Sequence, residues 1–222
     1  MGKEREKSAS EEAEGENRDR EARQQGATKD GQSGSKEQDL SKGDALIVVD
    51  AQNDFFPGGS LEVPGAREVI PVLNHYLRSF HALSLPIYAT RDWHPAHHCS
   101  FKEQGGPWPV HCVAGTRGAE FHPEIHLPPS VVVISTATTE EKEAYSGFEG
   151  TDLHDRLQAA GVRRLFIGGL ATEYCVFNTV RDGCILGYEV RVIKDAIRAV
   201  NVKPGDGRKT LEEMIRLGAE MI

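Results

Sequence analysis

Short apolar runs alternate with longer amphipathic segments from residue 44 onward. The runs are rich in Val, Ile and Leu and are bounded by polar, glycine or proline residues; they cover residues 45–50, 86–90, 130–135, 164–170 and 188–193. Continuous apolar runs of this kind are typical of strands that are buried on both faces of a sheet. We therefore predict five buried strands.

The segments between these runs have the apolar spacing of helices. In residues 67–83 the large apolar side chains recur every three or four positions, at Ile70, Leu73, Leu77 and Phe80. Further helices are predicted before the glycine at position 161, over residues 173–187 and over residues 208–221. Strands that alternate with helices indicate an α/β fold, with one mostly parallel sheet and helices on both of its faces.

Ligands of such folds bind beyond the carboxyl ends of the strands. Residues with useful chemistry lie at or just after the predicted end of four different strands: Asp50, Asp92, Thr136 and Cys175. We expect these four side chains to lie at the same edge of the sheet.

Residues 1–43 lack this alternation. They contain no aromatic residue, one Leu and one Met, and long runs of Glu, Lys, Arg, Gln, Gly and Ser. Such a segment cannot bury enough apolar surface to offset its ordering entropy, so we predict a disordered charged tail. It also lacks the apolar core of a signal peptide. The remaining residues, 44–222, suit one domain.

Composition narrows the class of protein further. The net charge of −8 argues against nucleic acid as a partner, and no apolar run is long enough to cross a membrane. The four cysteines show no spacing that demands disulfides, which favours a cytoplasmic protein with free thiols. A homo-oligomer is compatible with the sequence.

The stretch "RDWHPAHHCSF" (91–101) suggests a metal site. Asp92 and His94 are two positions apart in extended chain, so their side chains project to the same side, and His111 adds a second imidazole. One carboxylate and two imidazoles suit zinc, iron or manganese and leave positions open for water or substrate. His98 and Glu103 are further candidate ligands. There are two alternatives to a hydrolytic metal site. The histidines could be solvated loop residues, or the protein could be a non-haem iron oxygenase, a class that the β/α alternation disfavours.

A candidate nucleophile is Cys175, which follows a buried strand and opens a predicted helix. A thiol in the first turn of a helix is activated by the helix dipole, and backbone N–H groups there can face a developing oxyanion. Asp50 could accept the thiol proton and return it to a leaving group. The alternative is a small buried cysteine that packs the helix, as we expect for Cys184.

Five motifs, in order, resemble the nicotinamidases of the isochorismatase-like cysteine hydrolases: "LIVVDAQNDFFPGGSLEV", "ATRDWHPAHHCSF", "GGPWPVHCVAGTRGAEFHP", "EAYSGFEGTDL" and "GLATEYCVFNTVRDG". The resemblance covers the whole predicted domain and implies a three-layer α/β/α fold. It also implies hydrolysis of nicotinamide to nicotinate and ammonia through a thioester, beside one divalent metal ion, with zinc favoured over iron or manganese.

The resemblance also implies roles for individual residues. Cys175 matches the nucleophile and Asp50 the general acid and base, while Asp92, His94 and His111, with His98 in some members, match the metal ligands. The ring-binding pocket would contain Phe55, Trp108 and Tyr145. The backbone N–H groups of Ala171 and Cys175 would form the oxyanion hole, and the Leu170–Ala171 bond matches the position of a cis peptide.

The chain departs from the family at Thr136, where similar members have a catalytic lysine. The flanking residues Ile134, Ser135, Ala137 and Tyr145 stay in register. Threonine supplies a hydroxyl and no charge, so the positive charge that would stabilise a thiolate and an ionised aspartate is lost. Three hypotheses follow: a nicotinamidase of impaired rate, an amide hydrolase of another substrate that is rescued by Lys142, and a non-catalytic protein that binds metal and nicotinamide.

Overall fold

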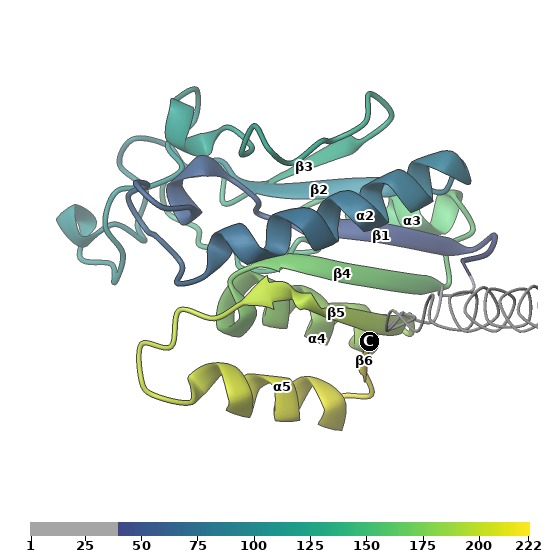
Figure 1. The fold of residues 1–222 in the computed structure, drawn as a ribbon. Helices are drawn as coiled ribbons and strands as arrows, with labels where there is room; N and C mark the ends of the chain where they lie inside the picture. Colours follow the sequence, from purple (N-terminus) through teal and green to yellow (C-terminus); the bar gives the residue numbers. More distant parts are fainter. Residues whose placement is uncertain (1–39) are drawn as a thin grey trace, which may run out of the picture. The chain divides into compact units, whose positions relative to one another are not determined.

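The computed structural model describes residues 40–222, whose sheet has six strands in the order β3-β2-β1-β4-β5-β6 (Figure 1). Every pair of neighbouring strands is parallel. The strands are β1 (Asp44–Val49), β2 (Ile87–Asp92), β3 (Val132–Thr136), β4 (Arg164–Leu170), β5 (Glu189–Arg198) and β6 (Glu220–Met221). The predicted α/β fold with a parallel sheet is confirmed. Of the tail predicted for residues 1–43, residues 1–39 lie outside the described residues.

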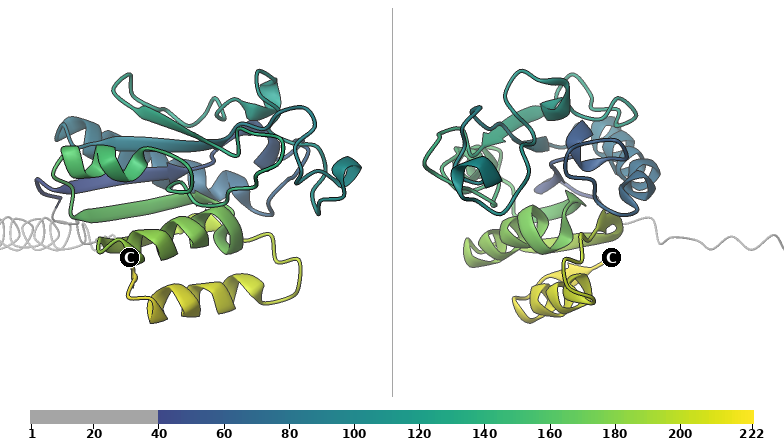
Figure 2. Two further views of the ribbon diagram at one scale, coloured as in Figure 1. Left: turned by 180° about the vertical axis from the view of Figure 1, so that it is seen from behind. Right: turned by 90° about the vertical axis from the view of Figure 1, so that its left-hand side faces the viewer.

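Helices cover both faces of the sheet. They are α2 (Val69–Ala82), α3 (Leu153–Ala159), α4 (Phe177–Ile185) and α5 (Asp206–Arg216). In Figure 1, α2 crosses in front of the sheet, and the reverse view in Figure 2 brings α3 and α4 to the front. None of the helices in residues 40–222 combines the length and the apolarity that a membrane span requires.

The core divides into two clusters because successive residues of a strand face opposite sides of the sheet. Strand β1 is buried along its whole length. Its Leu46 and Val48 belong to the cluster under α2, together with Leu73 and Phe80. The alternate residues of β1 belong to the second cluster, which is formed with α3, α4 and α5: Ala45, Ile47, Val49, Leu153, Leu157, Val180 and Met214.

The last predicted helix was too long. Residues 208–221 were expected to be helical throughout, but α5 ends at Arg216 and residues 220–221 form the short strand β6. Gly218 has a φ of +100°, its N–H donates to the Ile215 carbonyl, and the Ala219 N–H donates to the Met214 carbonyl. These two bonds form a Schellman cap that ends the helix and redirects the chain to the sheet.

Candidate active site and metal centre

The four expected residues do meet at the carboxyl edge of the sheet. Asp50 directly follows β1, with a φ of +46°, and Asp92 is the last residue of β2. Thr136 ends β3 and lies opposite Asp92 in the strand register. Cys175 follows β4 after the cis peptide bond between Leu170 and Ala171, which the sequence resemblance predicted.

The sequence predicted Cys175 in the first turn of an α-helix. It lies instead in a π-helical turn, Thr172–Val176, that precedes α4. The chain must turn sharply between β4 and α4, and the Val176 N–H closes this turn by donating to the Ala171 carbonyl. Cys175 is buried, with 7% of its surface exposed. It is held at the base of a pocket and not on the surface of the helix.

Asp92, His94 and His111 form a buried cluster of metal-type ligands. The Asp92 Oδ2 atom lies 3.5 Å from His94 Nε2 and 3.8 Å from His111 Nε2. The ligand atoms of all three residues lie within 4.8 Å of one another. The spacing that predicted these three residues therefore does bring them together.

The hydrogen bonds of the two imidazoles fit a metal ion. His111 Nδ1 lies 2.8 Å from the Pro109 carbonyl, so Nδ1 carries the proton and the lone pair of Nε2 faces Asp92. Burial lowers the pKa of His111, which favours its neutral, metal-binding form. His94 Nε2 is buried and has no hydrogen-bond partner among the described residues. A buried, unpartnered nitrogen aimed at a carboxylate and a second imidazole fits the role of a metal ligand.

The structure does not bring His98 into this cluster. Its Nδ1 pairs with the Ser100 hydroxyl at 2.7 Å, and its Nε2 pairs with the Lys142 carbonyl at 3.1 Å. Its ring stacks on that of His94, with 4.3 Å between centroids. His98 therefore packs against His94 and connects two loops. Glu103, the other further candidate, is exposed to solvent.

Two residues that sequence reasoning missed support the metal cluster. Gln52 is completely buried; its Nε2 donates to the carbonyls of Asp92 at 2.7 Å and Ala119 at 3.0 Å, and its Oε1 accepts from the Asp92 N–H at 2.8 Å. Asp54 accepts the Cys112 N–H at 2.7 Å, next to His111. Both lie in the motif after β1, but their partners lie far away along the chain.

Asp50 lies where it can exchange a proton with Cys175. The Thr90 hydroxyl donates to Asp50 Oδ1 at 2.6 Å. Burial, with the Asp92 carboxylate nearby, raises the pKa of Asp50 to about 7. Burial and the Asp50 carboxylate also raise the pKa of the Cys175 thiol well above its ordinary value. The protein alone thus favours a neutral thiol beside a carboxyl group that titrates near neutrality.

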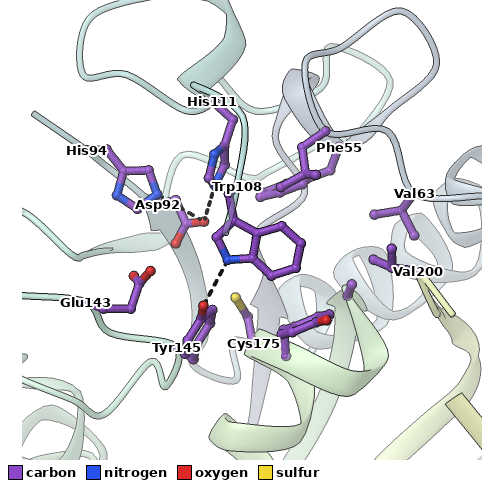
Figure 3. A pocket seen from close by; sticks show the side chains of 13 residues that line it. Phe55, Val63, Asp92, His94, Trp108, His111, Glu143, Tyr145, Cys175 and Val200 are labelled. Atoms are coloured by element: carbon purple, nitrogen blue, oxygen red, sulfur yellow. Dashed lines mark hydrogen bonds and ion pairs between the residues drawn. The ribbon is translucent and has the colours of Figure 1, made fainter. Parts of the chain in front are cut away.

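An apolar pocket opens above the thiol (Figure 3). The predicted aromatic residues Phe55, Trp108 and Tyr145 all line it, and the Trp108 Nε1–H donates to the Tyr145 hydroxyl at 2.9 Å. Tyr174 and Glu143 also line it and were not predicted. The pocket therefore combines flat aromatic walls with the thiol and the metal-type ligands.

The model of the isochorismatase domain matches residues 44–222. The chain belongs to the isochorismatase family. It is 36% identical over 198 residues to the nicotinamidase of Escherichia coli (strain K12), with 80% of this chain and 93% of that relative covered. The predicted resemblance to nicotinamidases is confirmed, and the chain is a nicotinamidase-like amidohydrolase of the isochorismatase family.

Solved structures of isochorismatase-family proteins agree with this assignment. The pyrazinamidase of Pyrococcus horikoshii in complex with zinc is 51% identical, with a TM-score of 0.78 and coverage of 81% of this chain and 98% of that one. PnC1 from L. infantum in complex with nicotinate is 34% identical, with a TM-score of 0.72 and coverage of 82% and 93%.

Thr136 stands at the position where the sequence resemblance predicts a lysine. Its hydroxyl lies 3.2 Å from the Arg91 carbonyl and 3.3 Å from Asp92 Oδ1. No lysine or arginine lines the pocket in residues 40–222. Lys142 is exposed. Its Nζ lies near Gly150, 3.8 Å from the position that a Cβ atom on this glycine would take. The rescue of activity by Lys142 therefore finds no support in this arrangement.

Proposed function

We propose that this chain hydrolyses a pyridine carboxamide, nicotinamide in the first place, to the carboxylate and ammonia, at a rate lowered by Thr136. The observation that carries the proposal is the convergence of Cys175, Asp50 and the Asp92 cluster in one aromatic pocket. The similarity to nicotinamidases supports the choice of substrate.

The reaction needs one nucleophile and one proton carrier. Asp50 accepts the proton of the Cys175 thiol as the sulfur attacks the amide carbon, and the same proton then leaves with ammonia as the C–N bond breaks. Water next attacks the thioester carbon and gives a proton to the Asp50 carboxylate, and Asp50 passes this proton to the sulfur as the C–S bond breaks, which releases the acid and restores the thiol. The backbone N–H groups of Ala171 and Cys175 would stabilise the oxyanion in both steps.

The aromatic pocket would hold the substrate ring. Phe55, Trp108 and Tyr145 offer flat faces and edges to a pyridine ring, and the Trp108–Tyr145 hydrogen bond fixes two of these walls. Asp92, His94 and His111 would hold the divalent ion, and zinc is our first choice because a relative was solved in complex with zinc. When bound, that ion would supply a Lewis-acid contact for the ring nitrogen.

Thr136 should weaken the reaction rather than substrate binding. Without a lysine ammonium group beside them, ionising both Cys175 and Asp50 in a buried site is costly. The loss of one electrostatic partner costs roughly 10²–10³-fold in rate, on the scale of a single oxyanion donor. The aromatic walls and the metal-type ligands do not depend on that charge.

The test is ammonia release from nicotinamide by the parent chain and by Thr136→Lys, Cys175→Ala and Lys142→Ala, each loaded with zinc, iron or manganese. We expect Thr136→Lys to raise kcat about 10²-fold or more, Cys175→Ala to be silent, and Lys142→Ala to match the parent. Ser135→Lys, one position away on the opposite face of β3, controls for the added charge. Activity that survives Cys175→Ala would overturn the proposal.

A second candidate function rests on the same missing cation. A pocket that has aromatic walls and metal-type ligands, but that no lysine or arginine of residues 40–222 lines, would suit a protein that binds nicotinamide and metal without turnover. Calorimetry distinguishes the two functions. If the parent chain binds nicotinamide and the Thr136→Lys variant is still inactive, the non-catalytic binding function is supported. Turnover by the parent that depends on Cys175 excludes that function.

A further inference from the structure

A second set of metal-type ligands overlaps the first. Asp50, Asp92 and Cys175 are all buried, and one ligand atom from each lies within 4.8 Å of the other two. We propose that these three residues bind a second divalent cation, which Asp92 bridges to the ion held by His94 and His111. The proposal rests on the proposed function in two respects only: that Asp92, His94 and His111 hold the first ion, and that Thr136 takes the place of a lysine.

The position of Asp92 suits a bridging carboxylate. Its Oδ2 faces both imidazoles, at 3.5 and 3.8 Å, whereas its Oδ1 faces the Thr136 hydroxyl at 3.3 Å. The two oxygens therefore point toward different neighbours. Sites with two metal ions commonly hold them about 3.5–4 Å apart, a separation that one carboxylate can span.

The donor atoms and their spacing suit a borderline ion such as Zn²⁺ or Co²⁺. Zn–S bonds are about 2.3 Å long and Zn–O bonds about 2.0–2.2 Å, so two donors on one ion lie at most about 4.5 Å apart. Around a tetrahedral ion such donors lie about 3.4–3.6 Å apart, so the three side chains would move together from separations of up to 4.8 Å. A thiolate with two carboxylates also favours such ions over Mg²⁺ and Ca²⁺, which prefer oxygen ligands.

When all three groups are ionised, no lysine or arginine of residues 40–222 lines the pocket to offset their charge. Three groups that can become anionic are buried together, and the two side chains that hold the carboxylates, Thr90 and Thr136, are neutral hydroxyls. Buried anions require a partner of opposite charge. Threonine is several atoms shorter than lysine and uncharged, so position 136 provides no ammonium group to these carboxylates.

Binding of the second cation has a defined proton balance. The Cys175 S–H bond breaks, its proton leaves to solvent, and a sulfur–metal bond forms; a proton held by Asp50 is released in the same way. The sulfur lone pair is then engaged by the ion, so the nucleophile is blocked. Excess zinc should therefore inhibit the parent chain, whereas in Thr136→Lys the ammonium group competes with the second ion.

The experiment is a titration of the chelator-treated full chain with Co²⁺, whose bond to a thiolate gives a charge-transfer band in the near ultraviolet. We expect two equivalents of Co²⁺ per chain, with the band present in the parent and absent in Cys175→Ala. Thr136→Lys should bind one equivalent and lose most of the band. The matched controls Cys99→Ala and Cys184→Ala should keep it. His111→Ala should weaken the first site and leave a band that still depends on Cys175.

One equivalent in the parent, or a band that persists in Cys175→Ala, would overturn the second site. A band that is as strong in Thr136→Lys as in the parent would also overturn it. These readouts are independent of turnover. If Thr136→Lys loses the second ion and still releases no ammonia, the proposed function fails and the second metal site is supported. If Thr136→Lys gains activity although the parent bound only one ion, the second metal site fails and the proposed function is supported.

Discussion

Replacing Gln52 with methionine tests how the metal cluster is held in place. Methionine has a similar volume, so the change removes hydrogen bonds without opening a large cavity. Three buried backbone groups lose their partner: the N–H and carbonyl of Asp92 and the carbonyl of Ala119. Each buried group that is left unsatisfied costs about 1–3 kcal/mol. With partial relaxation we expect the free energy of unfolding to fall by about 3–6 kcal/mol, a large part of the stability of a typical domain.

The same change should weaken zinc binding, because Gln52 fixes the backbone of the ligand Asp92. Loss of such a supporting partner typically costs about 10–100-fold in metal affinity. Urea unfolding followed by tryptophan fluorescence measures the first effect, and competition with a chromophoric chelator measures the second. Asn53→Ala is the control, since its bond to the Arg117 carbonyl is exposed. A stability loss under about 1 kcal/mol with unchanged zinc affinity would refute the reasoning.

Three further predictions concern the fold and its titration. Because the pKa of Asp50 rises from 3.8 to about 7 on folding, the folded state binds the extra proton, and the stability of the chelator-treated chain should fall as pH rises between these values; Asp50→Asn should flatten that dependence in urea unfolding. Gly169→Ala should abolish soluble expression, because the new Cβ would lie 1.9 Å from the Val49 carbonyl oxygen at a φ of +138°. Arg164 contacts the buried Asp44 carboxylate at 2.6 and 2.8 Å. Arg164→Met removes this charged partner and should lower the free energy of unfolding by about 3 kcal/mol in urea unfolding. Asp44→Asn in the same background should restore part of the loss.

Much of the fold could be predicted because buried parallel strands and amphipathic helices leave strong local patterns. The five longer strands were found, although β5 extends to Arg198 rather than ending at residue 193. Strand β6 was missed because it has only two residues and its pairing with β5 depends on a turn at Gly218. A two-residue strand has no periodicity of its own.

The candidate site divides in the same way. Asp92 and His94 could be predicted because they lie close together on one extended segment. Glu143 lines the pocket from a loop and Tyr174 from the π-helical turn, and a single sequence does not encode the path of either segment locally. The role of Gln52 was missed for a related reason: its partners lie 40 and 67 residues away along the chain. Hydrogen bonds of that range become visible only when the strands have been assembled.

The placement of Thr136 on strand β3 has a consequence for how this chain can change over evolution. β3 is an edge strand with β2 as its sole neighbour in the sheet of residues 40–222. Threonine is β-branched and suits such a strand, and its hydroxyl adds a contact to the Arg91 carbonyl, whereas lysine is a poorer strand former. Under the proposed function, the residue that suits the strand and the residue that suits amide cleavage would therefore be different. One substitution at position 136 would then change both stability and catalysis and leave the rest of the domain intact.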